Sequence, residues 1–148
     1  MRNPTLDVYI ADIATVADLL TKSSSVLDKV PTDGGWSAAQ CLAHLADAEI
    51  SLSLRVRMMF TSDGYKFLNW DEDAFAALNP KRSGLASVGV FTALRRANVE
   101  LFEGLSEEQM SRTGIRTDGS EITVLAYIEY MNKHVTAHLE QAIRALAN

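Results

Sequence analysis

The chain has 148 residues, a length that suits one domain with a single hydrophobic core. Apolar residues make up 47% of it and charged residues 22%, which excludes a disordered or fibrous chain. The net charge of -5 and the pI of about 5.1 give no overall field that attracts phosphate, so nucleic acid is not an expected partner. We therefore predict a single domain over residues 1–148.

The first residues and the cysteine content bear on where the protein is found. Residues 1–7 meet polar side chains before any apolar stretch forms, unlike a secretory signal. No apolar run approaches the ~20 residues of a membrane span. Because Cys41 is the only cysteine, an intramolecular disulfide is impossible. We expect a cytoplasmic protein with no membrane partner.

Apolar residues spaced three and four positions apart predict two helices in the first part of the chain. The first covers residues 6–20 and weakens at three consecutive serines. The second covers residues 37–60. Its start is marked by Ser37 as the capping residue, by Gln40 as the reciprocal partner and by Trp36 just before the cap.

Residues 61–84 show no sustained periodicity, apart from one helical turn predicted at residues 74–78. Loops of this length are uncommon inside compact domains unless they have a function. The segment therefore links the second predicted helix to a third and is itself of functional interest.

The remaining apolar residues predict two more helices. The third covers residues 85–105 and is expected to carry Arg95 on its exposed side, whereas the fourth covers residues 122–146 and has the most regular apolar stripe. Two glycine-containing breaks separate them, and a short extended piece is possible at residues 113–117.

Four amphipathic helices without a long run of two-residue alternation predict an all-α fold, a four-helix bundle. The long link between the second and third helices can cross the length of the bundle, so these two helices are expected to run parallel. The predicted topology is therefore up-down-down-up.

The second helix is apolar on more than one side. Its core-facing stripe is predicted to be centred on Ala43, Ala46, Ile50 and Leu54. A second apolar surface lies roughly opposite and consists of Cys41, Leu45, Leu52 and Met59. We expect this surface to meet a second subunit in a homodimer, the alternative being that the long link covers it.

The only three histidines are candidate metal ligands. His134 and His138 lie four residues apart on one helical face, so both rings can reach a single ion; a merely hydrated helix face is the alternative. Catalytic zinc sites usually have three protein ligands, and His44 lies on the flank of the predicted stripe of the second helix. Asp47, one turn further on, is a candidate proton acceptor or outer partner, unless it is simply solvated.

Other side chains near these positions are weaker candidates. Tyr127 and Tyr130 could offer hydroxyl groups, although tyrosines at helical spacing more often pack with an exposed polar tip. Trp70 is expected to anchor the long link or to cover the pocket. The acidic run at 71–73 is expected to be solvated, and the thiol of Cys41 to be buried and structural.

Two segments of the chain carry a resemblance to a known family. The first is W-S-A-A-Q-C-L-A-H-L-A-D-A-E at residues 36–49. The second is T-V-L at residues 123–125, followed by H-V-T-A-H-L-E-Q at residues 134–141. Together they resemble the DinB-like (DinB/YfiT) superfamily of metal-binding four-helix bundles.

The resemblance implies a metal triad on His44, His134 and His138, an up-down-down-up bundle and frequent dimers. It implies zinc or nickel as the metal, with iron or manganese possible. Characterised members include transferases and isomerases, so it also implies a metal-dependent enzyme, a transferase that uses a low-molecular-weight thiol activated at the histidines. The alternative is a noncatalytic binding or stress-related protein in which the metal only joins two helices.

Overall fold

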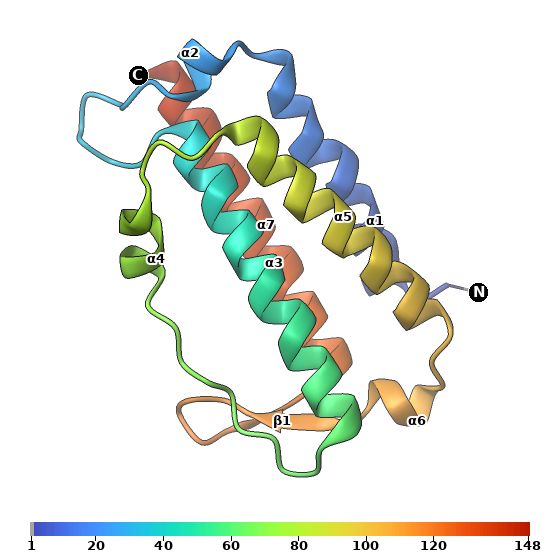
Figure 1. Ribbon diagram of the computed structural model, residues 1–148. Helices are drawn as coiled ribbons and strands as arrows, with labels where there is room; N and C mark the ends of the chain where they lie inside the picture. The colour runs from blue at the N-terminus through green and yellow to red at the C-terminus, as the bar shows by residue number, and fades with distance from the viewer. Residues whose placement is uncertain (1) are drawn as a thin grey trace.

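The computed structural model describes residues 2–148 and is a bundle of four long helices (Figure 1). The long helices are α1 (Pro4–Ala17), α3 (Ala38–Thr61), α5 (Gly84–Glu103) and α7 (Val124–Ala147). The shorter helices are η1 (Asp18–Thr21), α2 (Ser24–Leu27), α4 (Glu72–Leu78) and α6 (Glu107–Met110). The predicted all-α four-helix bundle is confirmed. Within residues 2–148, no helix is both long and apolar enough to cross a bilayer.

The long helices run up, down, down and up, as the sequence predicted (Figure 1). Helices α3 and α5 are parallel neighbours because residues 62–83, which we call the crossover, return along the whole bundle. The start of α5 lies close to the start of α3 at Gly84, where a Cβ atom would lie 3.3 Å from the side chains of Leu27 and Leu42. A glycine therefore permits the close approach of these segments.

Helix α3 begins where the sequence predicted. The Ser37 hydroxyl accepts a hydrogen bond from the Gln40 backbone N–H at 3.1 Å, and the Gln40 side chain accepts one from the Ser37 N–H at 2.9 Å. This capping box satisfies two backbone donors that the helix leaves free. It fixes the rotational position of the first turns, and with it the direction of His44.

The predicted core stripe of α3 is wrong in its lower half. Ile50 and Leu54 are 52% and 57% exposed, whereas the supposed outer surface is buried in the bundle core. That buried surface consists of Cys41, Leu45, Leu52 and Met59. Alanines occur all round the first turns and did not distinguish the faces, so the larger side chains decide the orientation. The homodimer remains a prediction, but this surface is not available to a second subunit.

Helix α5 buries an arginine that the periodicity placed outside. Arg95 is fully buried, so its predicted exposure is wrong. Its guanidinium Nε lies 3.1 Å from Glu49 and its Nη1 lies 3.2 Å from Asp12. Both carboxylates come from other helices, so the sequence around Arg95 does not indicate that it has buried partners. We call the group of Tyr9, Asp12, Glu49, Ser53, Arg95 and Asn98 the buried polar cluster.

A small hairpin closes the lower end of the bundle (Figure 1). It pairs β1 (Thr113–Ile115) with β2 (Glu121–Thr123) in antiparallel fashion; the first strand falls on the extended piece that was predicted, and the second was not predicted. Phe67 of the crossover donates its backbone N–H to the carbonyl of Ile115 at 2.8 Å. Gly114 lets Phe67 approach, since a Cβ there would lie 2.6 Å from its ring.

Candidate metal centre

The three histidines meet between α3 and α7, which are packed against each other. Each offers a ring nitrogen within 4.8 Å of the other two, and the ring centroids are 4.3 to 4.9 Å apart. The Nε2 atoms of His44 and His134 are 3.0 Å apart. The structure thus brings together the three predicted side chains His44, His134 and His138, which we call the histidine group.

The geometry of the histidine group fits one divalent ion. Zinc lies about 2.0–2.1 Å from histidine nitrogen, so two ligands of one ion are roughly 3 Å apart, as the Nε2 atoms of His44 and His134 are. The Nδ1 of His138 lies 2.8 Å from Oε1 of Gln141. Such a hydrogen bond selects the tautomer that leaves the other ring nitrogen free to bind metal.

Burial keeps two of these rings uncharged. Together with the adjacent His138, it lowers the pKa of His44 to about 4 and the pKa of His134 to about 3. Neutral imidazole is the form that binds metal ions. The Nδ1 of His134 is buried and has no hydrogen-bond partner within residues 2–148. The chain itself therefore leaves the histidine group incompletely satisfied.

Aromatic side chains and one carboxylate surround His44. Trp36 and Trp70 lie on it with ring centroids at 5.2 and 5.9 Å, so Trp70 covers the site as the sequence suggested. Oε2 of Glu72 lies 3.9 Å from Nε2 of His44. The predicted acidic run is exposed, but Asp71 caps α4 and thereby directs Glu72 toward the histidines. The sequence prediction missed this residue, although the cap itself was detectable.

Asp47 is paired with an arginine of the crossover. Its two carboxylate oxygens accept hydrogen bonds from Nη1 and Nη2 of Arg82, both at 2.8 Å. Arg82 also donates to the carbonyl of Phe75 at 3.3 Å. Asp47 therefore ties the crossover to α3, and its candidate role as a proton acceptor stays a prediction.

The remaining candidates also have defined places. Cys41 is fully buried, and burial raises the pKa of its thiol to about 11, in keeping with a structural role. Tyr130 is 56% exposed. Tyr127 is buried, and its hydroxyl accepts a hydrogen bond from Nη1 of Arg55 at 3.1 Å.

A cleft of about 420 Å³ adjoins the histidine group. Its walls include Arg55, Phe67, Trp70, Glu72, Arg116 and Tyr127, and two of these, Trp70 and Glu72, are the neighbours of His44 described above. No histidine lines this cleft directly, and none lines a larger cavity of about 840 Å³ where α1 begins and α5 ends, which also lacks Trp70 and Glu72. The smaller cleft is therefore the one that a reactant at the histidine group would occupy.

A comparison with protein-family models shows to which family the chain belongs. The model of the DinB superfamily matches residues 9–142, which include all three histidines and both tryptophans that flank His44. The chain belongs to the DinB superfamily. The resemblance noted in two short segments therefore extends over nearly the whole chain.

Curated members of the DinB superfamily similar to this chain are named "putative metal-dependent hydrolase". YfiT of Bacillus subtilis (strain 168) is 24% identical over 95% of this chain and 82% of its own length. A protein of Bacillus cereus (strain AH820) is 24% identical over 90% of this chain and 83% of its own. One of Oceanobacillus iheyensis is 26% identical over 84% and 73%, respectively.

A solved structure of YfiT supports the fold. It is described as "a probable metal-dependent hydrolase with an unusual four-helix bundle topology", and it matches with a TM-score of 0.87 at 21% identity. The match covers 95% of this chain and 83% of the YfiT chain. The up-down-down-up arrangement of this DinB superfamily member is therefore shared with a known relative.

Proposed function

We propose that this protein is a metal-dependent enzyme in which His44, His134 and His138 hold one divalent ion beside the reaction site. The observation that carries the proposal is the convergence of three ring nitrogens within 4.8 Å, beside Trp70 and Glu72, which line an open cleft. Within residues 2–148, no fourth ligand atom joins the group at this separation. Three ligands with an adjoining cleft are typical of catalytic sites, whereas structural sites are closed by a fourth.

A divalent ion such as zinc or nickel would act here as a Lewis acid that polarises a carbonyl group and favours deprotonation of a nucleophile. Oε2 of Glu72 lies near His44 and is half exposed, so it can accept the proton that the nucleophile loses. Trp36 and Trp70 cover His44 and exclude bulk water from its ring, which strengthens electrostatic interactions there.

Two nucleophiles are compatible with this arrangement. The names of the relatives favour water, and hence hydrolysis, as the reaction. The family resemblance favours a low-molecular-weight thiol, and hence thiol transfer. A thiol would have to come from outside the chain, because Cys41 is fully buried. The cleft of about 420 Å³ offers room for a second reactant. We place hydrolysis first and thiol transfer second.

Metal analysis of protein purified without a histidine tag tests the proposed site. We expect one zinc or nickel ion per chain, and we expect His138→Ala to lower the affinity by roughly 100-fold or more. Glu107→Ala, an exposed change on α6, is the control and should leave the affinity unchanged. Absence of stoichiometric metal after zinc and nickel have been offered, or equal affinity in both variants, would overturn the metal site.

Turnover tests the reaction. A panel of esters, amides and thiol–electrophile pairs is assayed with and without chelator. Glu72→Gln is expected to lower kcat by about 10²-fold or more while metal content is retained, since a carboxylate base is removed. Asp73→Asn, its exposed neighbour on α4, should have little effect. Turnover without thiol supports hydrolysis, and turnover only with thiol supports transfer. Bound metal with no turnover of either kind would favour the noncatalytic alternative.

A further inference from the structure

We propose that Arg55 is an anion-binding residue, and that the cleft takes a small carboxylate with a flat apolar body. In this arrangement the carboxylate lies against Arg55 and the reactive group points toward the histidines. The inference rests on the proposed function in one respect: the histidines are taken as the place where the reactive group of the ligand is converted. Binding of the carboxylate to Arg55 does not depend on metal.

The guanidinium of Arg55 is fixed by neutral groups only. Nη1 donates to the hydroxyl of Tyr127 at 3.1 Å, and Nη2 donates to the carbonyl of Leu68 at 2.7 Å. Cζ lies 4.5 Å from the centre of the Phe67 ring. Within residues 2–148, no carboxylate oxygen lies within 4.0 Å of this side chain. The positive charge is therefore held in place but not compensated.

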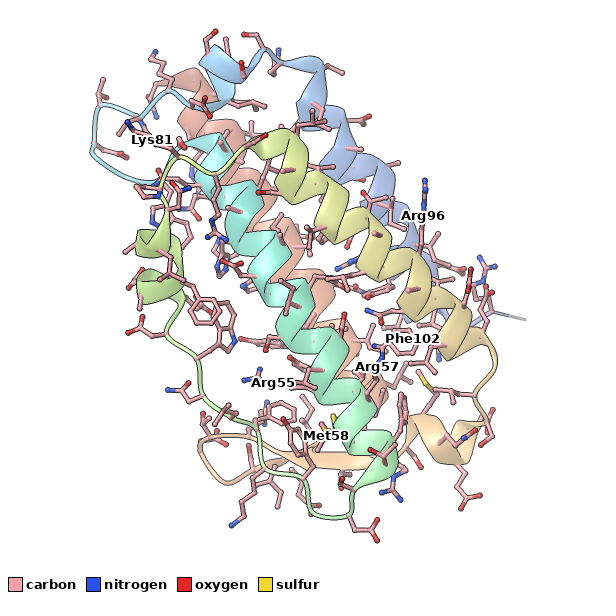
Figure 2. The ribbon with its side chains drawn as sticks, viewed as in Figure 1. Arg55, Arg57, Met58, Lys81, Arg96 and Phe102 are labelled. Atoms are coloured by element: carbon pink, nitrogen blue, oxygen red, sulfur yellow. The ribbon has the colours of Figure 1, made fainter. Side chains whose placement is uncertain are left out.

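Most of the N–H groups of Arg55 remain available. A guanidinium has five N–H donors, of which two are used here. The planar group can donate to two carboxylate oxygens at once, and an anion gains more from a charge in a partly enclosed cleft than from one on open surface. Figure 2 shows Arg55 on the side of α3 that faces the crossover, whereas Arg57 points to the other side. The fixed charge thus belongs to the cleft.

The rest of the cleft matches such a ligand. Phe67, Trp70 and Tyr127 provide flat apolar walls. Arg116 adds a second positive charge, held by a hydrogen bond from its Nε to the Ser120 hydroxyl at 2.8 Å.

The two carboxylates in the lining do not oppose this placement. Hydrogen bonds from Ser120, and to a lesser extent the charge of Arg116, hold the pKa of Asp118 below its usual range. Glu72 lies beside the histidine group. Arg116 has Asp118 beside it, so the uncompensated positive charge in the lining is that of Arg55, and Glu72 lies on the side nearer the histidine group.

The experiment measures ligand binding in metal-free protein. The chain has two tryptophans, and Trp70 lines the cleft whereas Trp36 does not. The indole N–H resonances of both are followed by NMR while benzoate, or its neutral analogue benzamide, is added. We expect benzoate to shift the Trp70 resonance in a saturable manner. Benzamide should bind at least about tenfold more weakly, because only benzoate carries the charge.

Variants assign the effect to Arg55. Arg55→Gln is expected to weaken benzoate about tenfold and to leave benzamide unchanged, and Arg55→Lys, which keeps the charge but loses the planar fork, should lie between. Arg96→Gln removes the same charge from an exposed position on α5 and should bind as the wild type does (Figure 2). Unchanged Trp36 resonances and unfolding temperature show that the variants are folded.

Three results would overturn the inference. These are equal binding of benzoate and benzamide, equal benzoate binding by Arg55→Gln and wild type, and benzoate binding that requires metal and ignores Arg55. The last would place the carboxylate on the ion. Loss of the metal site alone, with benzoate still bound through Arg55, would refute the proposed function and leave this inference standing.

Discussion

The bundle has two polar regions inside it, and they differ in how their groups are paired. In the buried polar cluster, Arg95 donates to Glu49, to Asp12 and to the backbone carbonyl of Tyr9, and its Cζ lies 3.9 Å from the centre of the Tyr9 ring. In the histidine group, one ring nitrogen of His134 has no partner within residues 2–148. Nη2 of Arg95 likewise has no partner among residues 2–148. The two regions therefore differ in charge pairing: the first pairs a cation with two carboxylates, whereas the second gathers three imidazoles that could hold a metal ion.

The buried polar cluster resembles a structural device more than a site. The hydroxyl of Tyr9 donates to Glu49, and Asn98 donates to the hydroxyl of Ser53 at 2.8 Å. Burial and then the charge of Glu49 raise the pKa of Tyr9. Because these residues come from α1, α3 and α5, the cluster joins three of the four long helices. Its worth lies in holding their register.

The largest expected effect is a loss of stability when the buried polar cluster is disrupted. Arg95→Met removes the only buried cation between Asp12 and Glu49 among residues 2–148 and leaves both carboxylates without their partner. Breaking a buried pair in this way typically costs about 3–5 kcal/mol, so we expect a loss of that order in the free energy of unfolding measured with urea. Arg96→Gln should change it by less than about 0.5 kcal/mol. Near-equal stability of both variants would refute the structural role of the cluster.

The next effect concerns the histidine group and the stability that a bound metal ion would add. His134→Leu replaces a half-buried imidazole whose Nδ1 is buried without a partner among residues 2–148, so the metal-free variant should be within about 1 kcal/mol of metal-free wild type. The difference should appear on adding metal. At a concentration of 100 times Kd, a ligand stabilises the folded state by about 2.7 kcal/mol, and His134→Leu should lose most of this.

Thermal unfolding with and without zinc measures both quantities. A large loss of stability in the metal-free His134→Leu protein would show that the histidine group is itself structural. An undiminished metal effect in that variant would remove His134 from the ligand set. Either result would contradict the distinction between a structural buried polar cluster and a metal-binding histidine group.

Local patterns in the sequence predicted much of the fold and the histidine group. The cap at Ser37 and the four-residue spacing of His134 and His138 are local, and the structure shows both as expected. Burial of Arg95 could not be predicted in this way, since its partners lie 46 and 83 residues away in the chain. The same holds for Arg55, which is held by Tyr127, 72 residues further on.

The crossover was the least predictable part that matters for the site. Periodicity gave one helical turn at residues 74–78, and the helix α4 indeed lies there, from Glu72 to Leu78. What periodicity could not give is the side of the bundle along which the crossover runs. That choice depends on contacts such as Asp47 with Arg82 and Phe67 with Ile115. These contacts place Trp70 and Glu72 beside His44.

The smallest expected effect is that of changing Asp47. This residue lies on α3 between His44 of the histidine group and Glu49 of the buried polar cluster. It is one turn from His44, yet both of its carboxylate oxygens are hydrogen-bonded to Arg82. The side chains are 10% and 30% exposed, so breaking the pair should cost only about 1 kcal/mol. Both Asp47→Asn and Arg82→Gln should therefore lower stability slightly and by similar amounts.

Turnover of the two variants separates the roles open to Asp47. If it only fastens the crossover, Asp47→Asn and Arg82→Gln loosen Trp70 and Glu72 alike, and kcat/KM should fall by the same small factor in both. If its carboxylate accepts a proton, Asp47→Asn should lose about 10²-fold in kcat or more, and Arg82→Gln, which keeps the carboxylate, should not. Equal small losses would show that Asp47 only holds the crossover against α3, and a loss confined to Asp47→Asn would show that its carboxylate takes part in the reaction.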